Sequence, residues 1–368
     1  MQLEAQGDST CCEAMWESVP CYTRIDPDGV SFSDILLELF RFHPLADRSC
    51  IMRWGVRSTF GFFLCASSFA QYPLRGQELP SAESTQPIEL LQVDSYSEGV
   101  VFGHQGEGYI SWADTITRFD LTGKHEVFAK TGAPNGHKIL ADGTHLVCDA
   151  SQHAVLHLSA DGKPLEPASK ECEGKPLRGP NDLTLDPAGG FYFTDPGDSS
   201  LDKPIGTVHY VDTAGKTHLV ASGLAFPNGI VLTADGKKLW VAESQKNRVL
   251  EYPVLSPGKV GSMKVLVDLP KSASGKWEDN QPDGMCLDQA GNLYVAHYGM
   301  KEVQVVDPSG KVIRRYAAGN QLTSNVAFGG PKRDQLFVTG AIEFNGKPGA
   351  VFRLDLNVPG RQVLPAKK

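Results

Sequence analysis

Six segments of this chain repeat one pattern: a short apolar strand, a turn rich in Gly or Asp, and a second apolar strand. Each segment opens at a residue whose side chain carries oxygen. These residues are Glu98, Asn135, Asn181, Asn228, Asp283 and Asn325. Successive openings lie 37 to 55 residues apart, and a propeller blade of four strands occupies about 40 to 50 residues. The spacing therefore predicts a chain of repeated antiparallel units.

The stretches between the hairpins also read as strands, for example VLHLSADGKPL, TVHYVDTAGKTHLVA and VQVVDPSGKVIRRY. Six hairpins, each followed by two more strands, predict an all-β fold, a six-bladed β-propeller. A solenoid has a shorter and more uniform repeat, and a β-sandwich does not repeat six times. We expect residues 71–368 to form the propeller domain, with residues 71–92 leading into the first blade or closing the ring.

The N-terminal fifth of the chain has a different character. From Met52 it reads MRWGVRSTFGFFLCASSFAQYP, with two early Arg residues, a short apolar stretch and a small-x-small pattern before Gln71. This order is typical of a secretory signal peptide, so we predict a signal at residues 52–70 and a periplasmic or secreted protein. Because a signal stands at the start of a chain, we interpret residues 1–51 as a spurious or disordered extension. A genuine N-terminal arm is the alternative.

Composition limits the classes of partner. The formal net charge of -8 and the lack of a Lys/Arg-rich block argue against nucleic acid. No apolar run approaches the roughly 20 residues of a membrane span. Only Cys148, Cys172 and Cys286 follow the expected cleavage site, and three scattered cysteines are neither a disulfide framework nor a zinc-finger spacing. We expect a small-molecule substrate and a monomer or weak oligomer.

The six opening residues predict a cation site. In a propeller the first strand of each blade lines the central axis, so equivalent positions of all blades meet there. Pro-Asn-Gly and Pro-Asp-Gly are also common turn sequences, which is the plain explanation for any one of them. Six oxygen-bearing side chains in register, two of them carboxylates, favour a divalent metal on the axis. Ca²⁺ takes such oxygen ligands, and Zn²⁺, Mg²⁺ or Mn²⁺ are further options.

The ends of the second strands return beside this ring. Fourteen or fifteen residues after the openings stand Asp149, Asp195, Glu243 and His297, with Trp112 and Thr339 as the equivalents in the other blades. These side chains either orient the metal ligands or cap strand ends. His297 is a polar pocket wall, a proton carrier or a packed neutral His.

One further histidine stands out by its position. His137 occupies a place where the other blades carry Val100, Leu183, Ile230, Met285 and Ala327. It therefore faces substrate or is a satisfied buried His.

Common hydrolase and nucleotide-binding motifs do not occur. The chain has no Gly-x-Ser-x-Gly elbow, no His-Glu-x-x-His sequence and no dinucleotide fingerprint.

Four sequences resemble a known family. SEGVVF, RGPNDLTLD with FYFTDP, FPNGIVLTADGKKLWVAES and QPDGMCLDQAGNLYVA are similar in order and spacing to the senescence marker protein/gluconolactonase/luciferin-regenerating enzyme family of six-bladed propellers. The resemblance covers roughly residues 90–355. It implies one divalent metal held by Glu98, Asn181, Asn228 and Asp283. It also implies lactone hydrolysis, with phosphotriester hydrolysis as a related activity.

One departure concerns the substrate. Sugar-lactone members of this family often carry Arg two residues before the Asn of the Pro-Asn-Asp motif. Here Gly179 holds that position and Arg178 stands next to it, so sugar recognition is in doubt.

We therefore expect a metal-dependent lactonase that opens its substrate with metal-activated water. Asp283 would be both a metal ligand and the general base. Asn135, Asn325, His137, Arg178, Asp195, Glu243 and His297 are candidates for contacting the substrate or supporting the ligands. A phosphotriesterase or arylesterase on the same site is the second hypothesis. A non-enzymatic ligand-binding propeller is the third.

Overall fold

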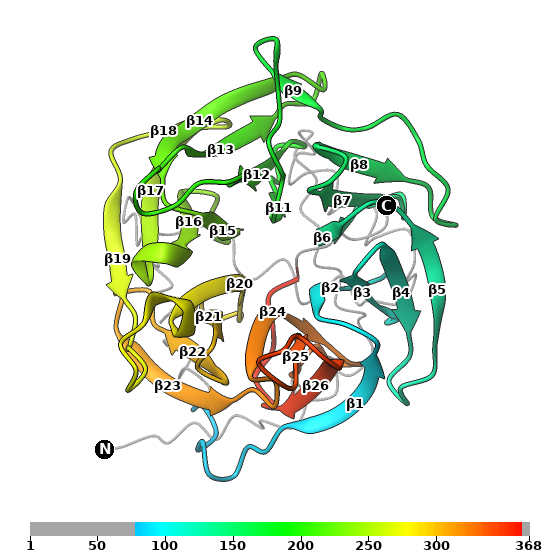
Figure 1. The fold of residues 1–368 in the computed structure, drawn as a ribbon, viewed down its shortest axis with the longest axis vertical. Helices are drawn as coiled ribbons and strands as arrows, with labels where there is room; N and C mark the ends of the chain where they lie inside the picture. The colour runs from blue at the N-terminus through cyan, green and yellow to red at the C-terminus, as the bar shows by residue number, and fades with distance from the viewer. Residues whose placement is uncertain (1–77, 363–368) are drawn as a thin grey trace, which may run out of the picture. The chain divides into compact units, whose positions relative to one another are not determined.

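The computed structural model describes residues 78–362, which form six antiparallel sheets arranged around a central axis (Figure 1). Two short 3₁₀ turns, η4 (Ser244–Lys246) and η5 (Trp277–Asp279), are the only helical elements in this range. The predicted all-β six-bladed propeller is confirmed. The extension at residues 1–51 and the signal peptide at residues 52–70, on which the predicted localisation depends, lie outside the described residues.

Each blade begins with a strand next to the axis. The innermost strands are β2 (Ser97–Phe102), β6 (Pro134–Ile139), β11 (Leu183–Leu185), β15 (Pro227–Leu232), β20 (Gln281–Leu287) and β24 (Leu322–Gly329). The second strands are β3 (Gly108–Trp112), β7 (His145–Asp149), β12 (Phe191–Asp195), β16 (Lys238–Glu243), β21 (Leu293–Tyr298) and β25 (Gln335–Ala341). All six expected hairpins are present.

The outer strands complete the blades. The third strands are β4 (Thr115–Phe119), β8 (Ala154–Leu158), β13 (Gly206–Val211), β17 (Arg248–Ser256), β22 (Glu302–Val306) and β26 (Gly349–Asp355). The outermost strands are β5 (His125–Lys130), β14 (Thr217–Leu224), β19 (Lys264–Asp268), β23 (Val312–Ala317) and β1 (Ile88–Val93). A short strand β18 (Lys259–Val260) also pairs with β17.

The N-terminal strand closes the ring. In β1, Ile88 pairs with Arg353 and Val93 pairs with Gly349 of β26, so the sixth blade is built from both ends of the described chain (Figure 1). This confirms that the segment ending near residue 92 closes the ring.

Two blades depart from the expected four consecutive strands. The sixth hairpin is followed by one strand of its own, because β1 supplies the fourth. The second blade has three strands, and two isolated bridges, Val155 with Ser169 and Leu158 with Pro164, stand where a fourth strand would pair. Pro164 and Pro167 fall in that stretch, and proline has no N–H for a ladder. The chain instead forms a separate ribbon of β9 (Glu171–Cys172) and β10 (Lys175–Pro176).

A bulge recurs in the innermost strands. In five blades the register shifts near the start of the hairpin, for example between Pro227 and Ile230 of β15 and between Pro282 and Met285 of β20. At each bulge the inner strand advances by three residues while its partner strand advances by two. A bulge rotates a side chain away from the alternation of the strand. Asn228 and Asp283 lie inside these bulges, at the start of their strands.

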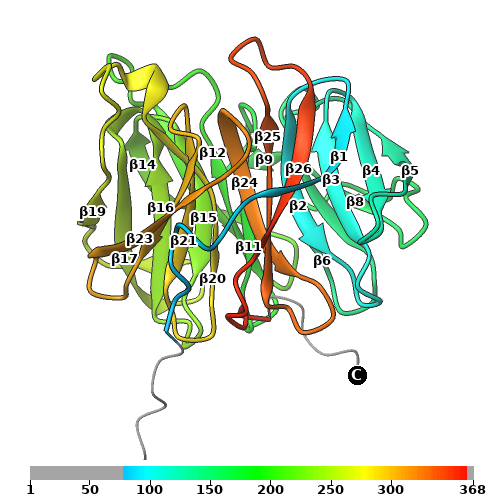
Figure 2. The ribbon, with the colours of Figure 1, turned by 90° about the horizontal axis from the view of Figure 1, so that it is seen from below.

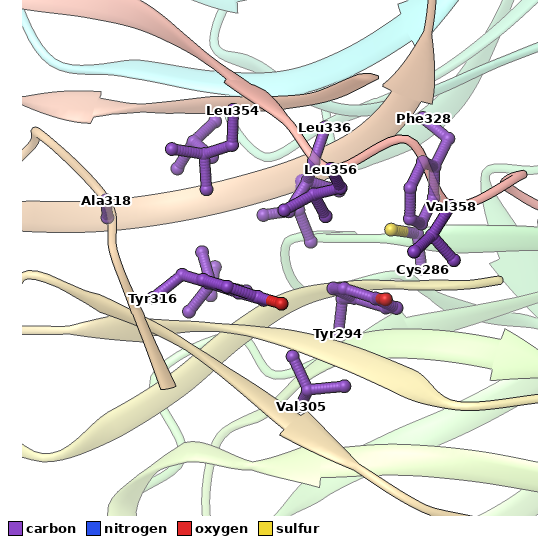
Figure 3. Packing of buried hydrophobic residues seen from close by; sticks show 14 residues of the cluster. Cys286, Tyr294, Val305, Tyr316, Ala318, Phe328, Leu336, Leu354, Leu356 and Val358 are labelled. Atoms are coloured by element: carbon purple, nitrogen blue, oxygen red, sulfur yellow. The ribbon is translucent and has the colours of Figure 1, made fainter. Parts of the chain in front are cut away.

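Apolar side chains pack between neighbouring blades. Figure 3 shows the cluster between the fifth and sixth blades, where Tyr294, Tyr316 and Leu336 are fully buried. The rings of Tyr294 and Phe328 meet edge to face at 5.0 Å between centroids. Val358 reaches this cluster from the C-terminal segment. Such packing holds the blades at fixed angles around the axis.

The inner strands define two mouths of the channel. We call the end at which they begin the upper mouth and the end at which they finish the lower mouth. In the side view, the connection between β25 and β26 rises at one end and the described C-terminus lies at the other (Figure 2). The upper mouth therefore carries the predicted ring of opening residues.

Candidate active site

Contacts between successive inner strands bring the opening residues together around the axis. A Cβ on Gly99 would lie 2.0 Å from the Asn135 carbonyl oxygen, and one on Gly229 would lie 2.2 Å from the Asp283 carbonyl oxygen. The Thr194 hydroxyl donates to the Asn228 carbonyl at 2.8 Å.

The remaining gaps in the ring are equally close. A Cβ on Gly136 would lie 2.7 Å from the Asn181 carbonyl oxygen. One on Gly284 would lie 2.2 Å from Asn325 Cγ. The Ser324 hydroxyl donates to the Ser97 carbonyl at 2.6 Å, which joins the sixth blade to the first.

Glycine after the opening residue makes this approach possible. Gly99, Gly136, Gly229 and Gly284 each follow an opening residue and each abut the next inner strand within 3 Å of where a Cβ would stand. Real Cβ contacts are longer than this, so a side chain here would push neighbouring strands apart. The Asn-Gly and Asp-Gly pairs thus serve the close packing of the ring as well as its turns.

Three carboxyl groups crowd the upper mouth. Burial raises the pKa of Glu98 to about 8, with the Tyr96 hydroxyl opposing the shift and Asp182 adding to it. Burial, together with the charges of Glu98 and Asp182, holds the pKa of Asp283 well above its usual range. Burial likewise raises the pKa of Asp182. Buried carboxyl groups at this density are costly unless a cation compensates them.

Two buried oxygens of the ring have no partner. Glu98 Oε2 and Asn181 Oδ1 accept no hydrogen bond within the described residues. The Asn228 side chain opposes the rise in the pKa of Asp283. Unpaired buried acceptors are rare, and these two belong to the four residues expected to hold a divalent cation. The donor set of two carboxylates and two amides fits a hard cation.

The described residues contain no metal site built from His, Cys, Asp and Glu alone. Among residues 78–362, no group of three or more His, Cys, Asp or Glu side chains is placed to hold a metal. The expected set contains only two such residues, and its other members are amides.

Asp182 is the site residue that the sequence analysis missed. It is buried beside Asn181, accepts a hydrogen bond from Leu183 N at 2.8 Å and lies 3.7 Å from Lys138 Nζ. Its position corresponds to the glycine that follows the opening residue in four other blades. The signal was available, because Pro-Asn-Asp replaces Pro-Asn-Gly only in this blade.

The sixth blade is one residue out of the expected alignment. Its register shift lies between Thr323 and Val326, with Thr323 paired to Gly340. When residues are counted from this shift, Ser324 aligns with Asn228 of the fourth blade. Asn325 then aligns with the glycine that follows Asn228. The residue that aligns with His137 is then Val326 and not Ala327. The residue that aligns with Asp149 is Gly340 and not Thr339. Leu322-Thr323 lacks the Pro that precedes the opening residue in the second to fifth blades.

The carboxylates at the ends of the second strands hold the loops that precede the inner strands. Asp149 accepts hydrogen bonds from Gly132 N and Ala133 N. Asp195 accepts one from Gly179 N at 2.7 Å. These residues thus position the opening residues through the backbone.

Glu243 does the same in the fourth blade. Its carboxylate accepts a hydrogen bond from Ala225 N at 2.9 Å. It also pairs with Lys246 and Arg248 at 2.9 and 2.7 Å. Glu243, itself held by these two cations, therefore anchors the loop before Asn228.

The two histidines are packed neutral residues. His297 is fully buried and its Nε2 hydrogen-bonds to Asn247 Oδ1 at 2.9 Å, and burial lowers its pKa to about 3. His137 Nε2 shares a hydrogen bond of 2.7 Å with His145 Nδ1, and burial lowers the pKa of His137. His297 Nδ1 has a second partner in Gln304 Nε2 at 3.2 Å, whereas the buried His137 Nδ1 has no partner within the described residues.

Arg178 does not restore the Arg of the sugar-lactone motif. It is exposed, and its guanidinium donates to the carbonyl of Ile205 in the loop before β13. Two tyrosines instead stand beside the ring. The Tyr96 hydroxyl lies 3.5 Å from Asp283 Oδ2, and its ring meets Tyr298 edge to face at 6.1 Å. The side of the mouth next to Asp283 is therefore aromatic.

Fold and site together define a six-bladed propeller with a ring of carboxylate and amide oxygens at one mouth. The family profile described as "SMP-30/Gluconolactonase/LRE-like region" matches residues 96–342. The chain therefore belongs to the SMP-30/gluconolactonase/LRE-like family, which confirms the resemblance inferred from its motifs.

Individual relatives agree with this assignment. Diisopropyl-fluorophosphatase from Loligo vulgaris is 29% identical over 272 residues, which cover 66% of this chain and 85% of the relative. Lactonase drp35 from Staphylococcus saprophyticus is 30% identical over 287 residues, which cover 74% of this chain and 86% of the relative. The crystal structure of a calcium-binding protein, regucalcin, from Agrobacterium tumefaciens superposes with a TM-score of 0.62. It is 23% identical and covers 77% of this chain and 95% of its own.

Proposed function

We propose that this protein is a metal-dependent hydrolase that opens a lactone at the upper mouth of the propeller. Lactonases at about 30% identity and the family assignment support a lactone-hydrolysing function. The observation that carries the finer proposal is the pair of unpaired buried oxygens, Glu98 Oε2 and Asn181 Oδ1, in the ring that also contains Asn228 and Asp283.

Glu98, Asn181, Asn228 and Asp283 would hold one divalent cation, for which Ca²⁺ is our choice and Zn²⁺, Mg²⁺ or Mn²⁺ the alternatives. Oxygen ligands with two carboxylates suit Ca²⁺, and a structurally similar propeller is titled a calcium-binding protein. When bound, the cation would polarise the lactone carbonyl and lower the pKa of water.

Within the protein, Asp283 would take the proton from the attacking water. The Tyr96 hydroxyl, 3.5 Å from Asp283 Oδ2, holds that oxygen in position. The Asn228 side chain approaches the same carboxyl group from the fourth blade and opposes the rise in its pKa. A base held from two sides keeps the geometry that proton transfer requires.

The aromatic side of the mouth favours a substrate with an apolar body. Tyr96 and Tyr298 flank Asp283, and Arg178 is turned away from the Asn181 side of the ring. Phosphotriester or aryl ester hydrolysis on the same ring is therefore the second candidate, and similarity to a fluorophosphatase supports it.

Hydrolysis by the full chain tests the proposal. The protein is stripped of metal and then supplied separately with Ca²⁺, Zn²⁺, Mg²⁺ or Mn²⁺. Each form meets glucono-1,5-lactone, an aliphatic lactone, an aryl ester and a phosphotriester. Lactone opening that depends on metal and is lost in Asp283→Asn supports the proposal, with the exposed-site variant Asp161→Asn as the control. Folded, metal-loaded protein that cleaves none of the four would contradict it and favour a ligand-binding propeller.

We also propose that the protein is exported, with residues 52–70 as the signal peptide. The sequence MRWGVRSTFGFFLCASSFA supports this. N-terminal sequencing of the protein from its native source tests it. A mature chain that begins at Gln71 is expected, and peptides from residues 1–50 would contradict the proposal.

A further inference from the structure

The central channel opens into a cavity at its other end. A cavity of about 960 Å³ opens between the ends of the inner strands and the turns that follow them. Val100, Leu185, Met285 and Phe328 contribute to its largely apolar wall. None of the four expected cation ligands lines it. The lower cavity is therefore separate from the ring at the upper mouth.

The C-terminal segment delivers an arginine to this cavity. Arg361 N donates to the Leu287 carbonyl at 2.9 Å, and Gly360 N donates to the Arg333 carbonyl at 2.7 Å. These bonds fix the segment under the fifth and sixth blades. The side chains of Arg333 and Arg361 both line the cavity as a result.

Both guanidinium groups keep free donors. Within residues 78–362, neither Arg333 nor Arg361 forms an ion pair with a carboxylate. Arg361 donates one Nη1–H to the Leu232 carbonyl, which leaves the other N–H groups unused. Burial lowers the pKa of the Arg361 guanidinium. The charge of Asp235 opposes that shift, although no ion pair joins Asp235 to Arg361 within the described residues. A partly buried guanidinium with unused donors favours a further anionic partner.

A third cation stands at the cavity, together with acidic groups that are already engaged. Lys138 lines it and has only a 3.7 Å approach to Asp182 as an ion pair. Asp142 accepts hydrogen bonds from the backbone and hydroxyl of Thr144. Asp186 accepts one from Ala188 N at 2.8 Å. These bonds come from neutral donors and leave both carboxylates charged, so the three cations that line the cavity exceed its two carboxylates by one.

We propose that the lower cavity binds a small carboxylate with an apolar body, whose head group pairs with Arg361 and Arg333. The planar guanidinium groups match a carboxylate in two-point hydrogen bonding. The apolar wall of the inner strands takes the body of the ligand. This site does not depend on the proposed hydrolysis, because no residue of the upper ring contributes to it.

Calorimetric titration of the full chain with octanoate tests the proposal. Saturable binding with one site is expected, and Arg333→Gln or Arg361→Gln should weaken it about tenfold, since each removes a charge-assisted pair. Lys332→Gln is the matched control. Lys332 is exposed, adjoins Arg333 and does not line the cavity, so its affinity should stay within about twofold of the wild type.

The comparison compounds separate head group from body. Octanol and inorganic phosphate should each bind at least about tenfold more weakly than octanoate, because each lacks one half of the recognition. Asp283→Asn should bind octanoate like the wild type. The proposal would be overturned if both arginine variants bound octanoate as tightly as the wild type. Absence of saturable heat, or loss of binding in Asp283→Asn, would also overturn it. Arg333→Gln decides the case if Arg361→Gln unfolds.

Discussion

The hydroxyl of Tyr96 lies 3.5 Å from Oδ2 of Asp283, although 187 residues separate them in sequence. Tyr96 precedes the first inner strand and Asp283 belongs to the fifth blade. Ring closure alone brings them together. Their contact places an aromatic hydroxyl on the carboxylate that we propose as the base.

Tyr96→Phe should lower kcat about tenfold with little change in KM, because it removes a hydrogen bond to a catalytic carboxylate without a cavity. Steady-state kinetics with the best lactone measure this. Tyr252→Phe, a buried tyrosine of an outer strand, is the control. An unchanged kcat would mean that Tyr96 does not position Asp283.

Gly229→Ala should destabilise the fold by about 2 kcal/mol, because its Cβ would meet the Asp283 carbonyl oxygen at 2.2 Å. Denaturant unfolding measures the free energy. Gly179→Ala is the matched control, since its Cβ would have no neighbour closer than 3.7 Å. Equal stability of the two variants would refute the close packing of the ring.

Asp182→Asn should weaken binding of the divalent cation about tenfold, because it removes a buried negative charge beside Asn181 and leaves Lys138 without its partner. Calorimetry of metal-free protein with Ca²⁺ gives the affinity. The exposed variant Asp161→Asn should bind as the wild type does. If Asp182→Asn bound Ca²⁺ as tightly as the wild type, the Asp182 carboxylate would not contribute to cation binding.

The contribution of two buried histidines to the free energy of unfolding should fall as pH drops from about 6.5 to 4. Burial lowers the pKa of His145 and of His209 to about 4, while the unfolded chain takes up protons near pH 6.5. Stability from these neutral histidines is complete above pH 6.5 and is lost between that pH and their folded pKa values.

Urea unfolding at pH 7.5 and pH 5 measures this loss. His209→Gln should reduce the difference between the two pH values, whereas His125→Gln, which changes an exposed imidazole, should not. A difference in His209→Gln as large as in the wild type would show that this histidine does not contribute.

The sequence predicted the fold because its period survives in every blade. Pro-Asn or Pro-Asp before an apolar run marks the inner strand, and the shared axis then requires those residues to meet. The register of the sixth blade was wrong because Thr323 replaces the marking Pro, so Asn325 was aligned in place of Ser324.

Other features depended on contacts between blades. Nothing local to Asp182 shows that it faces Lys138 of the neighbouring blade. The environment of His137 depended on His145, which lies on the partner strand. The lower cavity needed the C-terminal segment that positions Arg361. The periodicity of the sequence is enough to predict the architecture. The partners of individual side chains can be identified only once the blades are assembled into the ring.

Metal-dependent hydrolysis by Glu98→Gln and the wild type tests the central claim most directly. Bound metal per chain would be measured by elemental analysis, beside lactone turnover by the same samples. We predict about one divalent ion per wild-type chain, with metal and turnover both lost in Glu98→Gln while the fold is kept. Full turnover by metal-free wild type, or by Glu98→Gln, would contradict the account.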